Sequence, residues 1–282
     1  KQKGIDVVLL MGNYPGYVAI PSMFFSKTKF VYCDHGALIN QIHEKPITII
    51  RFLTSIFADK TVTLTDKTRE DYIRYFHTGK KNILTIHNWL DDNVIKSAVP
   101  CNLDAKKVLC VGRFGEEKGY DLMVGAAKKF LPAHPDWQWH VYGNGETFDD
   151  IKALVEKEGL EGQLKLMGNN PNVLSLYRDY SLFVLPSYRE GLPLVLLEAK
   201  ANGLPIVSFN IDTGPCEMVE DGVNGFLIEP YDTDKLAEKL SLLADDDDLR
   251  RKFSQNAGRW MDKFDKQKIK SQWIELIESL SK

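Results

Sequence analysis

The stretch SLFVLPSYREGLPLVLLEAKANGLPIVSF (residues 181–209) contains two short apolar segments with a longer helical pattern between them. LFVLP and LPIVSF are rich in large apolar and β-branched residues, as buried strands are. Pro193 suits the first turn of a helix and Gly203 the position just after its end, which predicts a helix over about 193–202. This order of strand, helix and strand predicts a βαβ unit of a parallel sheet.

The same alternation runs along the whole chain. The other strand-like segments are DVVLLM, KFVYCDHG, KTVTLT, KNILTIHN, KKVLCVGRF, WQWHVYG, LKLMG and GFLIEP. We therefore predict an α/β fold with two doubly wound, Rossmann-like domains, one over residues 1–100 and one over 101–264, with their boundary in SAVPCNLDAKK (97–107). Ligands bind at the carboxyl ends of such strands, so a cleft between the two domains is the expected site.

The last segment, residues 265–282, is expected to form a helix that packs back on the first domain. Its apolar residues recur near helical spacing, at Ile269, Trp273, Ile274, Ile277 and Leu280.

Composition excludes several classes of protein. The 282 residues are 44% hydrophobic and 27% charged, which is typical of a globular protein, and the net charge of −3 with dispersed cations argues against a nucleic-acid partner. The four cysteines lack metal-ligand or disulfide spacing, which predicts no metal site and a cytoplasmic location. Two acidic runs, DTD (232–234) and ADDDD (244–248), are interpreted as helix starts.

Two further segments bear on membranes and on processing. ITIIRFLTSIFA (47–58) is shorter than a bilayer span and contains Arg51, so we interpret it as a buried amphipathic helix. The chain opens on a strand pattern without an initiator Met or a secretory signal, which leads us to expect that residues upstream are missing.

Glu190 and Glu198 stand on either side of seven mostly apolar residues. No Ser, Thr, Asp or Asn caps the helix between them, so its first N–H groups can bind an anionic ligand. Glu198 lies deeper in the apolar helix and needs a basic partner or a polar ligand. A structural salt bridge for Glu198 and a dipole-neutralising role for Glu190 are the alternatives.

Arg113 and Lys118 lie in a loop that follows the strand VLCV. Two cations on a short loop suit a diphosphate, because Arg can bind two oxygens and Lys adds a point charge. Surface ion pairs with Glu116 and Glu117 are the alternative. Gly143-Asn144-Gly145 lacks the third glycine of a dinucleotide-binding motif, and we interpret it as a tight turn that a ligand or another backbone approaches.

These motifs together resemble the group 1 (GT4) family of retaining glycosyltransferases. REGLPLVLLEAKANGLPIV is similar to its E-x7-E motif, and VGRFGEEKGYDLMV is similar to its R-x4-K diphosphate loop. SLFVLPS, TGPCEMVEDGVNGFLI, DHG and ILTIHN fall in the family's order, so the resemblance covers essentially the whole chain. It implies a GT-B fold, with the donor nucleotide sugar held by the second domain.

The resemblance also implies roles for particular residues. Arg113 and Lys118 would bind the diphosphate, Glu190 the hydroxyls of the sugar, and Glu198 the ribose. His35, which follows a strand of the first domain, would approach the sugar, although a lone histidine is more often structural. The other expected binding residues are Gly191, Leu192, Pro193 and Leu194 at the sugar or phosphate, Asn169, Asn170 and the segment to Asn172 at the base, and Gly143.

The implied activity is transfer of a hexose or N-acetylhexosamine from a nucleoside-diphosphate sugar, with UDP favoured, to an acceptor hydroxyl in polysaccharide or glycolipid synthesis. No cofactor and no metal are expected. The acceptor would be a saccharide or a lipid-linked saccharide, and the latter would place the protein in peripheral contact with the inner face of the membrane. TGPCEMV favours the type that assembles bacterial surface polysaccharides.

Two departures from the family pattern are present. Asn88-Trp89 stands where the family has Asn-Gly, and the chain starts part-way through the acceptor domain, without the first βα units and a glycine-rich loop. A nucleotide-sugar-binding module without catalytic activity is therefore an alternative. A GT-B epimerase or phosphorylase is a weaker one, because neither a cofactor lysine motif nor an epimerase carboxylate pattern is present.

Overall fold

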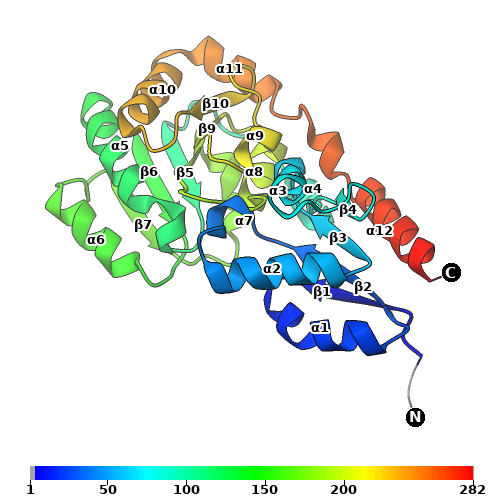
Figure 1. Cartoon of the computed structure of the whole chain (residues 1–282). Coiled ribbons are helices and arrows are strands. Elements are labelled where there is room, and N and C mark those ends of the chain that lie inside the picture. Colours follow the sequence, from blue (N-terminus) through cyan, green and yellow to red (C-terminus); the bar gives the residue numbers. More distant parts are fainter. Residues whose placement is uncertain (1–3, 282) are drawn as a thin grey trace. The chain divides into compact units, whose positions relative to one another are not determined.

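The computed structural model describes residues 4–281. The chain folds into two compact units. Unit 1 comprises Lys1–Trp89, Asp212–Gly214 and Lys263–Lys282, and unit 2 comprises Leu90–Ile211 and Pro215–Asp262. We describe each unit by itself (Figure 1).

Unit 1 contains a parallel four-stranded sheet in the order β1-β2-β3-β4. Its strands are β1 (Val7–Met11), β2 (Lys29–Asp34), β3 (Lys60–Thr63) and β4 (Ile83–Thr85). Its helices are α1 (Tyr14–Phe25), α2 (Lys45–Phe57), α3 (Asp66–Phe76) and α12 (Lys266–Leu280), with a short 3-10 helix η1 (Ile39–Gln41). Each of the first three helices connects one strand to its parallel neighbour.

The two faces of this sheet pack against different helices. Successive side chains of a strand point to opposite faces. Phe30 and Tyr32 of β2 pack in a core cluster with Tyr72 of α3, whereas Val31 and Cys33 pack in a cluster with residues of α12. The residues of α12 in that second cluster are Ile269, Trp273, Leu276 and Leu280, while Ile274 is exposed.

Unit 2 contains a parallel six-stranded sheet in the order β10-β9-β8-β5-β6-β7. The strands are β5 (Lys107–Val111), β6 (Gln138–Tyr142), β7 (Leu164–Gly168), β8 (Leu182–Leu185), β9 (Ile206–Phe209) and β10 (Gly225–Ile228). From β5 the chain winds to β7 in one direction, and from β8 to β10 in the other. The winding therefore reverses between β5 and β8, which is the place where open α/β sheets bind ligands.

The helices of unit 2 surround this sheet. They are α4 (Asp92–Ser97), α5 (Tyr120–Ala133), α6 (Phe148–Lys157), α7 (Val173–Leu176), α8 (Leu194–Ala201), α9 (Pro215–Met218), α10 (Thr233–Asp245) and α11 (Asp247–Gln255), with the 3-10 helices η2 (Glu116–Lys118) and η3 (Tyr177–Asp179). A further 3-10 helix, η4 (Met261–Phe264), lies where the chain passes from unit 2 back to unit 1. Helix α4 contacts α7 and α8, so residues 90–97 belong with unit 2.

The structure confirms the predicted α/β class, and all ten strand-like segments form strands. Asp232 and Asp246 accept hydrogen bonds from backbone N–H groups at the starts of α10 and α11, as the interpretation of the acidic runs requires. The interpretation of residues 47–58 as a buried helix is wrong in part. Ile49, Phe52 and Ile56 of α2 are exposed, because its inner side carries polar residues instead.

Candidate functional site

The loops that follow β5 and β8 meet in unit 2, and a glycine makes this approach possible. Gly119 has φ +62°, and a Cβ on it would lie 2.1 Å from the carbonyl oxygen of Pro186. No side chain fits there. The first loop carries Lys118 and the second carries Glu190, so the close contact of the two backbones also brings these side chains together.

Lys118 and Glu190 form an ion pair, with 2.7 Å between Nζ and Oε1. Ser187 donates a second hydrogen bond to the same carboxylate oxygen, also at 2.7 Å. The Glu190 side chain is largely buried and that of Lys118 is partly buried, so water screens this pair less than it screens a surface pair. Lys118 therefore does not form the surface pair with Glu116 or Glu117 that was the alternative.

Arg113 lies on the same loop but points into solvent. Its guanidinium contacts Glu117 at 2.8 Å and Glu146 at 3.5 Å. Hydrogen bonding to Glu117 raises the pKa of Arg113. In the structure, Arg113 thus forms the surface ion pair with Glu117 that the sequence analysis gave as the alternative to diphosphate binding. Exposed pairs of this kind contribute at most about 1 kcal/mol, so a diphosphate can compete with them.

A second pair of glycines joins the loop after β6 to the Arg113 loop. Gly143 has φ +144°, and a Cβ on it would lie 1.8 Å from the carbonyl oxygen of Gly112; a Cβ on Gly145 would lie 2.4 Å from that of Phe114. The tight turn at Gly143-Asn144-Gly145 is therefore approached by the backbone of the Arg113 loop. The loops enclose a cavity of about 270 Å³ at the carboxyl ends of the strands, lined by Val111, Gly112, Arg113, Tyr142, Gly143, Asn144, Asn169, Asn170 and Val173.

This cavity brings together four of the residues predicted from the sequence: Arg113, Gly143, Asn169 and Asn170. Asn170 also shapes its own loop, since its side-chain oxygen accepts a hydrogen bond of 2.8 Å from the backbone N–H of Asn172.

Helix α8 begins at Leu194, one residue after the predicted start. Pro193 occupies the N-cap position and makes no side-chain capping bond. Gly191, Leu192 and Pro193 thus lead from Glu190 into the helix, whose first residue is Leu194. The positive end of the helix dipole lies there, which favours an anion.

Glu198 lies one turn further along α8, and its partner is a residue that the sequence analysis missed. The hydroxyl of Tyr177 donates a hydrogen bond of 2.6 Å to Glu198 Oε2. Burial raises the pKa of Glu198, and the bond from Tyr177 offsets part of this rise. Because Tyr177 is a neutral phenol, the contact is not the salt bridge considered as an alternative. No pattern in the residues around Tyr177 would have indicated this role.

The Tyr177 side chain is itself held in place. It is fully buried in η3, and its ring stacks on Phe183 of β8 with centroids 5.8 Å apart.

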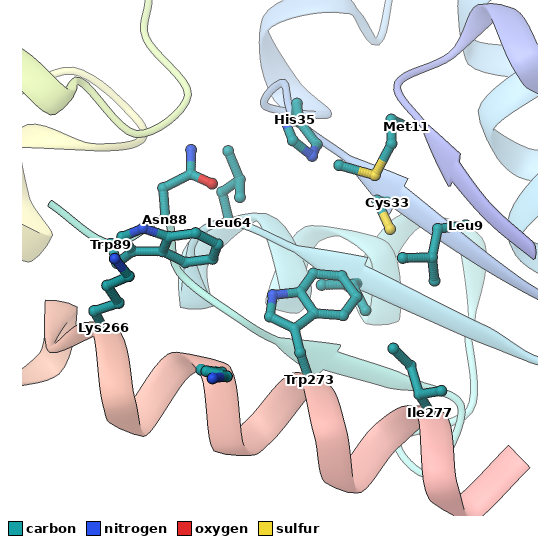
Figure 2. A pocket seen from close by; sticks show the side chains of 12 residues that line it. Leu9, Met11, Cys33, His35, Leu64, Asn88, Trp89, Lys266, Trp273 and Ile277 are labelled. Atoms are coloured by element: carbon teal, nitrogen blue, oxygen red, sulfur yellow. The ribbon is translucent and has the colours of Figure 1, made fainter. Parts of the chain in front are cut away.

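His35 belongs to unit 1, whereas the other predicted site residues belong to unit 2. It follows β2 directly and is exposed. It lines a cavity of about 500 Å³ that is mostly apolar (Figure 2). Trp273 and Ile277 point into this cavity from α12, and Leu9 and Met11 from β1. Asn88 and Trp89, the departure from the family pattern, also line it.

A buried polar network holds the loop that carries His35. Asp34 and Arg51, both about 1% exposed, form an ion pair with 3.3 Å between Oδ2 and Nε. Tyr72 donates a hydrogen bond of 2.7 Å to Asp34 Oδ2, and the backbone N–H of Gly36 donates one of 3.0 Å to Oδ1. No sequence pattern indicated this network, because its members come from three separate elements.

Comparison with known proteins shows which family the chain belongs to. The family profile described as "Glycosyl transferases group 1" matches residues 91–260, more than half of the chain. An uncharacterized glycosyltransferase of Haemophilus influenzae is 30% identical, over 80% of this chain and 63% of its own. The UDP-Gal:alpha-D-GlcNAc-diphosphoundecaprenol alpha-1,3-galactosyltransferase of Escherichia coli is 28% identical, over 77% of this chain and 60% of its own.

A similar solved structure is that of a Staphylococcus aureus TarM mutant in complex with Fondaparinux, alpha-GlcNAc-glycerol and UDP. It superposes with a TM-score of 0.81 at 25% identity, over 96% of this chain and 55% of that one. The chain thus spans less than two thirds of each of these proteins. It belongs to the group 1 (GT4) family of glycosyl transferases, and its two parallel sheets have the GT-B fold.

Proposed function

We propose that this protein is a retaining glycosyltransferase that transfers a hexose or N-acetylhexosamine from a UDP-sugar to an acceptor hydroxyl. The acceptor would be a saccharide or a lipid-linked saccharide of a bacterial polysaccharide or glycolipid. UDP in the TarM complex and UDP-Gal in the name of the Escherichia coli relative support the choice of donor.

The contact between Lys118 and Glu190 is the observation that carries this proposal. A cation and a carboxylate at the switch point, beside an uncapped helix start, can bind the two halves of a sugar diphosphate. The cation and the N–H groups suit the phosphates, and the carboxylate accepts hydrogen bonds from sugar hydroxyls. Arg113 is exposed on the same loop and can turn from Glu117 to the diphosphate.

In the proposed reaction the bond between the anomeric carbon and the diphosphate breaks, and the acceptor oxygen bonds to that carbon. Negative charge grows on the leaving diphosphate. Lys118, Arg113 and the start of α8 would stabilise this charge, as preorganised donors do in other enzymes. Glu198 would hold the ribose.

Titration with UDP followed by assays with UDP-sugars tests the proposal and separates it from its alternative. We expect UDP to bind in calorimetry and one of UDP-glucose, UDP-galactose or their N-acetylated forms to be turned over. Binding of UDP without turnover of any of these sugars would favour the nucleotide-sugar-binding module. Absence of UDP binding would contradict both.

Replacing Tyr177 by Phe should weaken recognition of the ribose while preserving the fold. In the wild type, the Tyr177 hydroxyl orients Glu198 and lowers the pKa of that carboxyl. The variant lacks this hydroxyl. Wild-type protein should bind UDP about tenfold or more tightly than one of its two analogues, 2′-deoxy-UDP and 3′-deoxy-UDP. That analogue lacks the ribose hydroxyl that hydrogen-bonds to a charged group of the protein. In the variant this difference should shrink, as measured by calorimetry.

Tyr180→Phe is the matched control. Tyr180 is also buried, but its hydroxyl contacts Tyr142 and His140 rather than Glu198. It should retain the discrimination between UDP and the deoxy analogues. Equal discrimination by wild type and Tyr177→Phe would show that Tyr177 does not act through Glu198.

A further inference from the structure

The turn between β10 and α10 in unit 2 has a tyrosine at a position that ordinarily takes glycine (Figure 1). The turn comprises Glu229, Pro230, Tyr231 and Asp232, and the backbone N–H of Asp232 donates a hydrogen bond of 3.2 Å to the Glu229 carbonyl. Pro230 is the second residue, and Tyr231, the third, has φ +72°. A proline followed by a residue of positive φ is typical of a type II turn, whose third position favours glycine or asparagine.

Tyr231 therefore adopts a strained backbone conformation. The left-handed region is unfavourable for a residue that has a Cβ, whereas glycine would form the same turn without this cost. Such strain persists where the surrounding contacts outweigh it. Tyr231 is 49% exposed, so burial of apolar area alone does not explain the choice of a tyrosine. Specific contacts of its side chain must offset the strain.

The Tyr231 side chain packs on the segment that carries Glu190. Its ring lies against the ring of Tyr188, with centroids 5.1 Å apart, and meets the ring of Phe209 of β9 edge-on at 6.2 Å. Its hydroxyl donates a hydrogen bond of 3.3 Å to the carbonyl oxygen of Tyr188. Tyr188 precedes Glu190 by two residues, so the turn after β10 holds the chain just before the carboxylate.

Tyr188 is also held from two other directions. Its hydroxyl donates a hydrogen bond of 2.6 Å to Asp121 Oδ2, in the first turn of α5. Burial raises the pKa of Tyr188 and the bond to Asp121 raises it further, so the phenol remains the donor. The backbone N–H of Tyr188 donates a bond of 2.9 Å to the carbonyl of Glu117, whose carboxylate pairs with Arg113. Tyr188 thus joins α5, the Arg113 loop and the turn after β10.

The segment from 186 to 193 depends on contacts of this kind, because it belongs to no helix or strand. Lys118 and Ser187 hold the Glu190 carboxylate at 2.7 Å each. Those bonds orient the side chain only when the backbone that carries it is in place. The contacts of Tyr188 and Tyr231 supply that placement.

We propose that Tyr231 is a positioning residue, which fixes the backbone of residues 187–190 so that Glu190 meets the hydroxyls of the donor sugar. It acts through Tyr188 and does not itself contact the substrate. This inference rests on the proposed function, which assigns the sugar to Glu190 and the diphosphate to Lys118 and Arg113. Loss of the Tyr231 side chain should therefore impair the sugar-dependent steps more than the binding of UDP.

Tyr231→Gly tests the proposal, because glycine favours the same turn and only the side chain is lost. In the full chain without ligand, hydrogen exchange of the amides of residues 187–192 should become about tenfold faster or more. The melting temperature should change by no more than about 3 °C, since relief of strain offsets the lost ring contacts. With the UDP-sugar that wild type turns over, kcat should fall about tenfold or more, because Glu190 is misplaced. UDP affinity in calorimetry should stay within about twofold.

Lys106→Gly is the matched control. Lys106 also has a left-handed φ, +52°, and is exposed. It precedes β5, whereas residues 187–190 follow β8, so the two lie at opposite ends of parallel strands. This variant relieves the same kind of strain and should leave the exchange of residues 187–192 and kcat unchanged.

Unchanged exchange of residues 187–192 in Tyr231→Gly would overturn the proposal. Faster exchange with unchanged kcat would do so too, because the segment would then be held without consequence for the reaction. A loss of UDP affinity as large as the loss of kcat would also contradict it, since the effect would not be confined to the sugar. If wild type turns over no sugar, the proposed function fails, and the exchange measurement still decides whether Tyr231 positions the Glu190 segment.

Discussion

Replacing Lys118 by Ala is expected to lower the rate of sugar transfer by about 10²–10³ and to weaken UDP binding. The side chain is the partly buried cation of the site, and its Nζ lies 2.7 Å from Glu190. Without Lys118, no ammonium group stabilises the negative charge on the leaving diphosphate. Glu190 also loses the ion pair that holds it in the position that suits the sugar. Initial rates with the UDP-sugar that wild type turns over, and calorimetry with UDP, measure the two effects.

Lys152→Ala is the matched control, because Lys152 is an exposed lysine of α6 in the same unit. It should leave both quantities unchanged. Near-normal turnover by Lys118→Ala would show that the residue does not contact the diphosphate. Unchanged UDP affinity with a lost rate would instead place Lys118 only at the sugar or the acceptor.

The second large effect concerns stability. Arg51→Met should lower the free energy of unfolding of unit 1 by about 3–5 kcal/mol, because it leaves the Asp34 carboxylate buried without its cation. Arg51 also donates a hydrogen bond to Asn13 Oδ1 at 3.1 Å, which is lost in the variant. Hydrogen exchange of β2 and β3 amides in increasing urea, on the full chain, reports unit 1 separately from unit 2.

Two further variants make this result specific. Arg51→Met combined with Asp34→Leu should recover much of the loss, since the uncompensated charge is removed. Arg74→Met, at an exposed arginine of α3, should change stability little. A loss below about 1 kcal/mol for Arg51→Met alone would mean that water reaches Asp34 in solution.

Much of the proposed site could be predicted from the chain because its residues follow strands. Arg113 comes shortly after β5, Gly143 directly after β6, and Asn169 directly after β7. In a parallel sheet these ends lie on one edge, so sequence order alone places them close together. The residues that orient the site could not be predicted. Tyr177 reaches Glu198 across 21 positions, and neither residue type nor spacing indicates that contact.

Helix α2 shows how local pattern and tertiary structure can disagree. Its apolar residues repeat at helical spacing, which predicted the helix correctly, but Ile49, Phe52 and Ile56 are exposed and the helix is not buried as expected. No helix within residues 4–281 has the length and apolar character needed to cross a membrane. The buried side is decided by what faces it. Asp34 and the glycine of α1 offer room and partners to Arg51 and Thr54, so the polar side turns inward.

The sequence by itself determined the elements, their parallel order and the family, because hydrophobic periodicity and the motifs at strand ends are local properties. Only the tertiary structure decided which polar groups became partners: Lys118 with Glu190, Tyr177 with Glu198, and Arg51 with Asp34. Such contacts join elements that are distant in the chain, and their geometry depends on how backbones approach, as at Gly119 and Gly143. Close approach of two backbones is a property of the packed fold, and no single segment encodes it.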